Sequence, residues 1–434
     1  MRGFPVHRDT TDFAENNLYL NNPGTAPACP PLDSDAVCDV CIIGAGLTGL
    51  STAQELAKRN VKTVILERHA PGWGASGRNG GQLWPGFFSR LQDAEKKFGK
   101  VLMKSLWDLS NEGINALRNN ITTQGVACEF FPGSVWAART EKHARDLDGY
   151  ITMLEKDYSY RLDLWDRAKI ETALGTTYYR SGVHDPLGGA LQPLQYANGL
   201  ATLVAKTATI HGETPATDVK RDGDGWRIIT PRGTVRAKKL VFSGDSYLGD
   251  LFPQLRRKYV LIRNAMVATR PRTGTFLPIS VCEYDDYLQF FRNTRDGRLI
   301  FGGGDTIRPL MSPVATQNRI TRSLEENISH IFPELSAGDI THRWGGYIGI
   351  TSSFLPNVGR VDKHTYYANG YSGHGLGLTH AAGRAIAESI FGDHKRIETF
   401  EKVRNMALPG IDRADFLFAR LGMMLYDVKN WWSH

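Results

Sequence analysis

Apolar residues recur along the chain with the spacings of strands and helices in turn. An apolar strand, a helix with small residues and a second strand follow one another over residues 37–67. Apolar residues three and four positions apart predict helices over 90–125 and 141–157. Residues 192–212 then predict a helix that leads back to a strand. This alternation is typical of the α/β class.

The second half of the chain predicts mainly short strands. Residues 218–244 predict two hairpins with Asp-Gly and Arg-Gly turns, which end in a buried strand. A strand-rich region runs from Tyr259 to Gly304 around the turn Thr-Arg-Asp-Gly. The remaining pattern predicts a helix at 316–332, strand and loop at 341–360, a short strand at 366–368 and a helix at 375–392. Residues 1–35 are polar and proline-rich toward their end, so an irregular lead-in is expected.

A Gly-x-Gly-x-x-Gly turn joins the first strand to its helix. Gly44 permits the tight turn, Gly46 lets a pyrophosphate approach the backbone, and Gly49 lets helix and strand pack closely. The helix N-terminus offers free N–H groups and the positive end of its dipole to phosphates. Glu67 ends the second strand, where it is placed to accept hydrogen bonds from a ribose. The pattern therefore predicts a bound dinucleotide; the alternative is an ordinary glycine-rich turn.

Composition narrows the class of protein. A chain of 434 residues with 41% hydrophobic and 22% charged residues is typical of a soluble globular protein with two domains or two lobes. It has no apolar run of about 18 residues and no secretory signal pattern at its start, so we expect a cytoplasmic protein without a transmembrane segment. The formal net charge of +7 comes without a long basic run or an RNA-binding motif. We therefore expect no nucleic-acid partner, and either a mildly basic surface or one that attracts anionic substrates.

The cysteines predict neither disulfides nor a metal site. Their number, five, is odd, which argues against a disulfide framework. Cys38 and Cys41 form a C-x-x-C in the first strand, where a spacing of three is expected to place the side chains on opposite faces. We therefore expect buried strand residues there, and no metal.

Several further segments together resemble one family. They are GASGRNGGQ (74–82), QPL (192–194), SGDSYLG (243–249), RLIFGGG (298–304), LPNVGR (355–360) and YSGHG (371–375). With the glycine turn, they resemble the D-amino-acid-oxidase-like family of flavoprotein amine and amino-acid oxidoreductases, and look most like its γ-glutamylputrescine oxidase branch. The resemblance covers about Cys38 to Gly410.

The resemblance implies a fold and a division of the chain. The fold is α/β: an FAD-binding Rossmann-like domain of three layers (ββα), interleaved with an α+β substrate domain on a mixed or antiparallel sheet. The expected FAD-binding parts are 36–98, 183–250 and 339–395, the substrate-domain parts are 99–182 and 251–338, and 396–434 is a C-terminal helical tail. The tail carries the amphipathic apolar segment FLFARLGMMLYDVKNWW, which we expect to pack on the protein body rather than on a membrane.

The same resemblance implies FAD as the cofactor, with the 74–82 loop wrapped around the flavin. Small residues there suit a flat ring stacked near backbone, and Ser76, Asn79 and Gln82 offer polar atoms to its edge. Non-covalent FAD is expected, because 341–360 contains no cysteine and 71–82 no histidine, the residue types that bind flavin covalently in relatives. The expected cofactor-binding residues are Gly44, Gly46, Leu47, Thr48, Gly49, Glu67, Arg68, Gly74, Ala75, Ser76, Arg78, Asn79, Gly80, Gly81, Gln82, Val219, Gly244, Gly346, Gly373, His374, Gly375 and Leu376.

His374 is the expected catalytic residue, because it lies in the turn that opens the 375–392 helix, whose N-terminus stabilises negative charge on the reduced flavin. His380 is expected to be structural. The expected substrate-binding residues are Trp84, Tyr284, Phe290, Arg292, Trp344 and Ile348.

The prediction about the substrate depends on Ile348. Relatives that oxidise glycine or D-amino acids have a carboxylate-binding arginine in a Trp-x-Gly-x-Arg-Pro segment, and Ile348 occupies that position here. Isoleucine cannot pair with a carboxylate, so an amine without an α-carboxylate, such as γ-glutamylputrescine, is expected. Arg263 or Arg292 remains an alternative clamp for an α-carboxylate, or could bind the distant glutamyl end of the substrate.

The expected reaction moves a hydride from the carbon beside a neutral amine to flavin N5 and gives an imine. Water hydrolyses the imine to an aldehyde, and dioxygen reoxidises the flavin to give hydrogen peroxide. Two alternatives stay open: an amino-acid or N-methyl amino-acid oxidase or dehydrogenase of the same fold that passes electrons to a quinone or carrier, and a non-catalytic flavoprotein or RNA-modifying module. A homo-oligomer is possible in each case.

Overall fold

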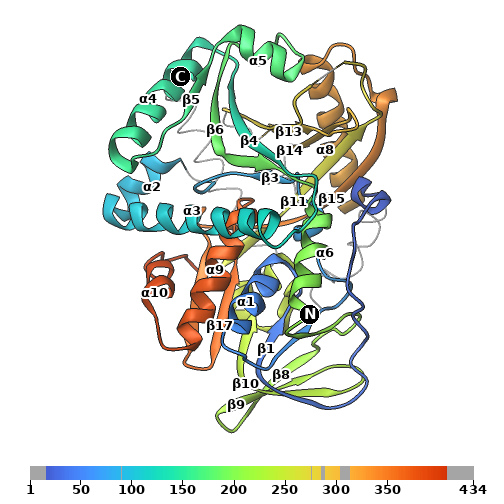
Figure 1. Ribbon diagram of the computed structural model, residues 1–434, viewed down its shortest axis with the longest axis vertical. Helices are drawn as coiled ribbons and strands as arrows, with labels where there is room; N and C mark the ends of the chain where they lie inside the picture. Colours follow the sequence, from blue (N-terminus) through green and yellow to red (C-terminus); the bar gives the residue numbers. More distant parts are fainter. Residues whose placement is uncertain (1–15, 89, 275, 285–288, 304–312, 408–434) are drawn as a thin grey trace.

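Two β-sheets form two lobes, one above the other in Figure 1. The computed structural model describes residues 16–88, 90–274, 276–284, 289–303 and 313–407. The segment FLFARLGMMLYDVKNWW, and most of the predicted C-terminal tail, lie outside these residues. No helix in the described ranges is long and apolar enough to cross a bilayer.

The lower sheet contains the predicted dinucleotide-binding unit. Its order is β16-β17-β10-β1-β2-β7, with the hairpin β8–β9 attached to β10. Strands β7, β2, β1, β10 and β17 run parallel, and β16 is antiparallel to β17. β1 is buried almost throughout its second half, as a central parallel strand covered on both faces must be. The bounds are β1 Ala36–Ile43, β2 Thr63–Leu66, β7 Thr209–His211, β8 Asp218–Asp222, β9 Gly225–Ile229, β10 Thr234–Phe242, β16 Asn357–Asp362 and β17 Thr365–Asn369.

The upper sheet is mixed. Its order is β15-β11-β14-β13-β12-β4-β6-β3, with β5 paired to β6, and β12 with β4 is its parallel pair. The bounds are β3 Gln82–Leu83, β4 Phe131–Ala138, β5 Asp163–Trp165, β6 Ser181–Ala190, β11 Tyr259–Thr269, β12 Ser280–Glu283, β13 Gln289–Asn293, β14 Leu299–Gly303 and β15 Ile340–Thr351. The predicted fold class, with two interleaved sheet domains, is confirmed.

Helices cover both sheets. They are α1 Leu47–Ala57, α2 Leu91–Phe98, α3 Lys100–Thr122, α4 Glu141–Tyr158, α5 Arg167–Leu174, α6 Pro193–Val204, α7 Pro253–Arg256, α8 Pro313–Ile331, α9 Gly375–Ile390 and α10 Lys395–Glu401. Single 3₁₀ turns are η1 Leu18–Asn21, η2 Ala75–Gly77, η3 Asp245–Tyr247, η4 Gly249–Leu251 and η5 Ala337–Asp339. The helices and hairpins predicted from spacing are present close to their predicted ranges.

The domain boundaries stay a prediction, but the sheets show where the chain changes lobe. Strand β6 pairs with β4, and β15 pairs with β11, both in the upper sheet. Both strands lie largely in segments that we predicted for the FAD-binding parts, 183–250 and 339–395. The predicted FAD-binding parts of the chain therefore include strands that belong to the upper sheet.

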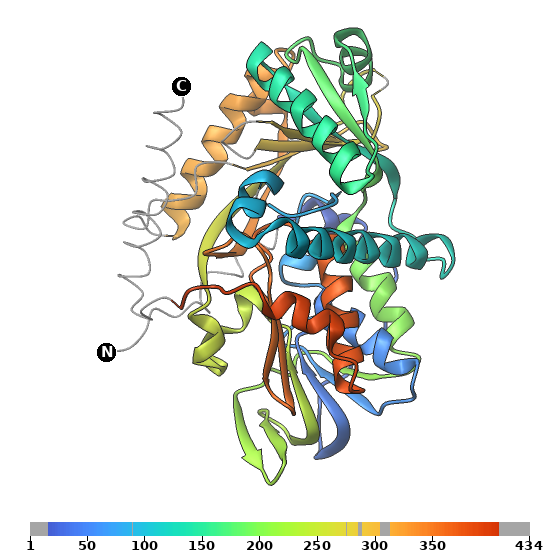
Figure 2. The ribbon, with the colours of Figure 1, turned by 90° about the vertical axis from the view of Figure 1, so that its left-hand side faces the viewer.

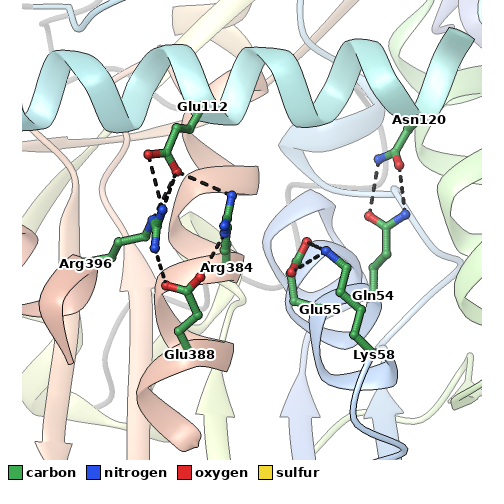
Figure 3. Close-up of polar contacts among 8 residues, drawn as sticks. All are labelled: Gln54, Glu55, Lys58, Glu112, Asn120, Arg384, Glu388 and Arg396. Carbon is green, nitrogen blue, oxygen red and sulfur yellow. Dashed lines mark hydrogen bonds and ion pairs between the residues drawn. The ribbon is translucent and has the colours of Figure 1, made fainter. Parts of the chain in front are cut away.

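α3 lies across the middle of the molecule, between the lobes, in both views (Figures 1 and 2). It contacts α9 very closely, because a Cβ on Gly113 would lie 2.2 Å from the Gly377 carbonyl oxygen. Figure 3 shows the polar contacts beside this crossing, where Glu112 pairs with Arg384 of α9 and Arg396 of α10. α3 therefore fixes the position of α9 on the cofactor lobe.

The predicted orientation of the cysteines is wrong. Cys38 and Cys41 pack in the same apolar cluster, whereas Val40 packs in the cluster on the other side of the sheet. The cause is an irregularity in β1, where the N–H groups of Asp39 and Val40 both donate to the Lys62 carbonyl, at 2.9 and 3.2 Å. Such a bulge shifts the alternation of faces by one residue. The cysteines are nevertheless buried and free, as expected.

Candidate functional site

A large cavity lies along the carboxyl ends of β1, β2 and β10 and continues to the upper sheet. Ligands in open α/β sheets bind at this edge, outside the carboxyl ends of the strands. Its wall contains the α1 N-terminus, residues 73–80, the segment after β10, strand β15 and the α9 N-terminus. Most of the predicted site residues are thus brought together by segments far apart in the sequence.

The three glycines of the turn have the predicted geometry. Gly44 has φ +107°, which an L side chain rarely adopts. A Cβ on Gly49 would lie 2.0 Å from the Gly44 carbonyl oxygen, so Gly49 serves helix packing and does not line the cavity. Gly46 caps α1 without a side chain, and the Leu47 N–H donates to Ser76 Oγ at 3.0 Å. The first turn of α1 therefore faces the cavity as an anion-binding site.

Glu67 lies at the end of β2 and lines the cavity. Its carboxylate accepts from the Ala45 N–H at 2.7 Å and from the His69 N–H at 3.0 Å. Burial raises the pKa of Glu67, although these two hydrogen bonds oppose the shift. A carboxylate has lone pairs beyond two, so the ribose contact predicted for Glu67 is compatible with both bonds.

Arg78 is buried in the cavity wall. Its guanidinium donates to Tyr247 Oη at 3.0 Å and to the Gly345 carbonyl at 3.3 Å, and it stacks on the Trp73 ring at 4.3 Å. Among the residues that the structure describes, no carboxylate forms an ion pair with it. Because a buried cation is usually paired, Arg78 is suited to an anionic part of a ligand.

The N-terminus of α9 also faces the cavity. His374 is its N-cap residue, and its Nε2 is buried without a hydrogen-bond partner among the residues that the structure describes. Burial lowers the pKa of His374 to about 4, so the ring is neutral near pH 7. Behind it, Tyr371 Oη and Thr48 Oγ1 share a hydrogen bond of 2.8 Å, which ties this turn to α1.

These features fit a flavin dinucleotide. The N-terminus of α1 and Arg78 suit its phosphates or another anionic group, Glu67 suits its ribose, and the Nε2 of His374 suits a polar ring edge. The sequence profile described as FAD dependent oxidoreductase matches residues 39–389. The chain belongs to this family of FAD-dependent oxidoreductases.

Similar proteins support the assignment of the chain to this family. The chain is 30% identical to gamma-glutamylputrescine oxidoreductase of Escherichia coli K12 over 406 residues, 92% of this chain and 94% of the relative. It is 31% identical to the probable oxidoreductase OrdL of Haemophilus influenzae over 410 residues, 92% of this chain and 93% of the relative. The solved glycine oxidase of Bacillus cereus has the same fold, with a TM-score of 0.69 at 20% identity over 84% of this chain and 98% of that one. The predicted family and FAD as cofactor are confirmed.

Most predicted FAD contacts line the cavity of this FAD-dependent oxidoreductase, but the roles of some side chains need correction. The Asn79 amide nitrogen donates to two earlier carbonyls of the loop, and its oxygen accepts from the Gly81 N–H. The Gln82 amide nitrogen donates to one carbonyl of β12 and one of β13. Both amides thus brace the loop instead of offering those atoms to the flavin edge. Gly49, Gly81 and Val219 do not line the cavity, and Pro215 and Ala216 occupy the wall near the place predicted for Val219.

The far end of the cavity is largely apolar. Of the predicted substrate-binding residues, Trp84, Phe290 and Ile348 line it. Trp344, Arg292 and Tyr284 are not among the residues that line it, and their contact with substrate stays a prediction. Trp344 is fully buried and donates to the Arg78 carbonyl at 2.9 Å, while Arg292 donates to the Gly80 carbonyl at 2.8 Å.

Several residues that line the cavity were not predicted from the sequence. Most are aromatic or apolar side chains, which a sequence does not distinguish from core residues. Asp245 and Tyr247 belong to the quoted segment SGDSYLG, so their place in the chain was a usable indication. Among the missed residues are His69, Trp73, Phe88, Trp136, Asp245, Tyr247, Asn264, Met266, Cys282, Tyr347 and Tyr371.

Proposed function

We propose that this FAD-dependent oxidoreductase oxidises an amine that has no carboxylate on the reacting carbon. The proposed substrates are γ-glutamylputrescine or a related polyamine or alkylamine, with dioxygen as acceptor, in cytoplasmic polyamine catabolism. Similarity to gamma-glutamylputrescine oxidoreductase supports this class of substrate.

The observation that carries the proposal is the place of Ile348. It lies on β15 opposite Ile262 of β11 and lines the cavity. Arg263, the alternative clamp, is buried and donates to Tyr347 Oη at 2.6 Å, and it does not line the cavity. In the described part of the wall the arginines are Arg68 and Arg78, both assigned here to the cofactor. An apolar wall at Ile348 suits the methylene chain of an alkylamine.

FAD held by these residues would supply the oxidising power for the reaction, as an acceptor for a hydride from the carbon next to the amine nitrogen, so that an imine would result. Water then converts the imine to an aldehyde and ammonia. The protein's own part is to hold that C–H bond and to exclude competing water. We propose that the aromatic side chains Trp84, Trp136 and Phe290 surround the amine, and that neutral His374 contacts the flavin edge or the substrate.

Substrate kinetics test the proposal, together with a measurement of hydrogen peroxide. We expect γ-glutamylputrescine or simple alkylamines to bleach the flavin anaerobically and to give the highest kcat/KM. Ile348→Arg is expected to lower kcat/KM for these amines at least about tenfold, because it buries a charge against a methylene chain, while Ile348→Leu keeps it. If glycine, sarcosine or a D-amino acid is preferred tenfold by the unmodified enzyme, the proposal is wrong.

A further inference from the structure

Five consecutive backbone carbonyls of the predicted flavin loop are each held from outside the loop. They are those of residues 77–81, which lead from the end of the 3₁₀ turn η2 to the start of β3. Their donors are Asn17 Nδ2 to Gly77 (3.2 Å), Trp344 Nε1 to Arg78 (2.9 Å), Tyr19 Oη to Asn79 (3.0 Å), Arg292 Nε to Gly80 (2.8 Å) and the Leu191 N–H to Gly81 (2.8 Å). Because buried carbonyls need donors, the shape of this loop depends on these partners.

Two of the five donors come from residues 17–22, which we name the N-terminal clasp. Tyr19 is only 2% exposed, and its ring meets the Trp344 ring edge-on at 5.4 Å. Its hydroxyl donates to the Asn79 carbonyl and lies 3.5 Å from Arg292 Nη2. Burial raises the pKa of Tyr19, so the hydroxyl keeps the proton that it donates.

The clasp is itself firmly attached. The Gln192 side-chain nitrogen donates to the Asn22 carbonyl at 2.7 Å, and Asn17 Oδ1 accepts from the Tyr19 N–H at 3.1 Å. The clasp precedes the residues matched by the family profile, 39–389. Its contacts therefore come from outside the part of the chain that defines the family.

We propose that the N-terminal clasp is a working part of the flavin site, in which Tyr19 and Asn17 are positioning residues for the loop at 74–82. Tyr19 lines no part of the cavity, so its effect on the cofactor passes through the Asn79 carbonyl. The inference rests on the proposed assignment of the loop to the flavin.

Tyr19→Phe tests it, since only the hydroxyl is lost and the ring keeps its packing on Trp344. The control is Tyr366→Phe, because Tyr366 is 1% exposed, its hydroxyl donates to the Lys363 carbonyl at 3.2 Å, and it lies outside the cavity wall. Titration of the apoprotein with FAD, the visible spectrum of the bound flavin and hydrogen exchange of the peptide covering 74–82 are compared. We expect Tyr19→Phe to weaken FAD binding about tenfold, to alter the flavin spectrum and to speed exchange in that peptide. Tyr366→Phe should change none of these, and Asn17→Ala should act in the same direction as Tyr19→Phe.

Two outcomes are distinguishable failures. If the unmodified protein binds FAD but Tyr19→Phe matches Tyr366→Phe in affinity, spectrum and exchange, the clasp has only a structural role and the inference is overturned. If Glu67→Ala, Arg78→Gln and Tyr19→Phe all leave FAD binding unchanged, both the inference about the clasp and the assignment of the cavity to FAD are wrong.

Discussion

At the scale of single residues, Glu67 offers the clearest test of the cofactor site. Glu67→Ala removes the carboxylate proposed to bind the ribose, and hydrogen bonds to charged groups contribute about 1.5–3 kcal/mol. We expect FAD affinity to fall by roughly that free energy, while turnover of the FAD-saturated enzyme changes little. Glu55→Ala is a suitable control, since Glu55 pairs with Lys58 on the same βαβ unit and lies outside the cavity wall (Figure 3). Lost turnover with unchanged FAD affinity would place Glu67 at the chemistry instead.

A second residue-scale prediction concerns His380, which the structure makes a core residue as expected. Its Nδ1 lies 3.1 Å from the Leu376 carbonyl, which requires a proton on Nδ1, so Nε2 accepts from Tyr196 Oη at 2.7 Å. Burial lowers the pKa of His380 from 6.5 to about 4. As pH falls from 6.5 to 4, the His380 ring is protonated in the unfolded chain but stays neutral in the folded chain. The free energy of unfolding therefore decreases.

The expected slope from this one group is at most about 1.4 kcal/mol per pH unit. Denaturant unfolding of the unmodified protein and of His380→Gln, measured between pH 7 and pH 4.5, checks it. The variant should be less stable at pH 7 and should lose less stability on acidification. Parallel stability curves for the two proteins would show that His380 does not contribute to acid sensitivity.

At the scale of elements, the crossing of α3 and α9 sets where the α9 N-terminus points. Gly113→Ala would place a Cβ 2.2 Å from the Gly377 carbonyl oxygen. One helix must then move, so we expect a destabilisation of about 1–3 kcal/mol and an altered flavin spectrum. Gly149→Ala in α4 is the matched control, because no described atom beyond the adjacent residues and nearby backbone of α4 lies within 4 Å of the new Cβ, and alanine favours a helix. Equal effects of both substitutions would argue against a close crossing.

Sequence patterns were sufficient for elements whose residues interact locally. The turn at Gly44 and the order of strands and helices follow from side-chain spacing and backbone freedom. Patterns failed where a distant partner decides the outcome. The bulge in β1 depends on the Lys62 carbonyl, and Trp344 and Arg292 donate to carbonyls of a loop more than two hundred positions away. The sequence predicts only an irregular lead-in at the clasp around Tyr19, because the hydrogen bonds of the clasp reach residues about sixty positions away.

At the scale of the whole molecule, a cofactor between two lobes should stabilise both of them together. Because FAD binds the folded chain, at a free concentration 100 times its dissociation constant it adds about 2.7 kcal/mol to the free energy of unfolding. We expect the melting temperature of the apoprotein to rise with FAD concentration in a single cooperative transition. Two separate transitions, with only one shifted by FAD, would show that the lobes unfold independently.

The same molecule should release its flavin without breaking a covalent bond. Cys282 lines the cavity, but burial raises the pKa of its thiol, so the thiol stays protonated. A protonated thiol is a poor nucleophile. We therefore expect acid precipitation to leave all of the yellow colour in the supernatant, and added FAD to restore the melting temperature and spectrum of a refolded or mildly stripped apoprotein. Cys282→Ser should behave identically. If the flavin stays with the precipitate of the unmodified protein but is released from the precipitate of Cys282→Ser, Cys282 is a covalent attachment point. If the flavin stays with the precipitates of both proteins, the covalent bond is elsewhere.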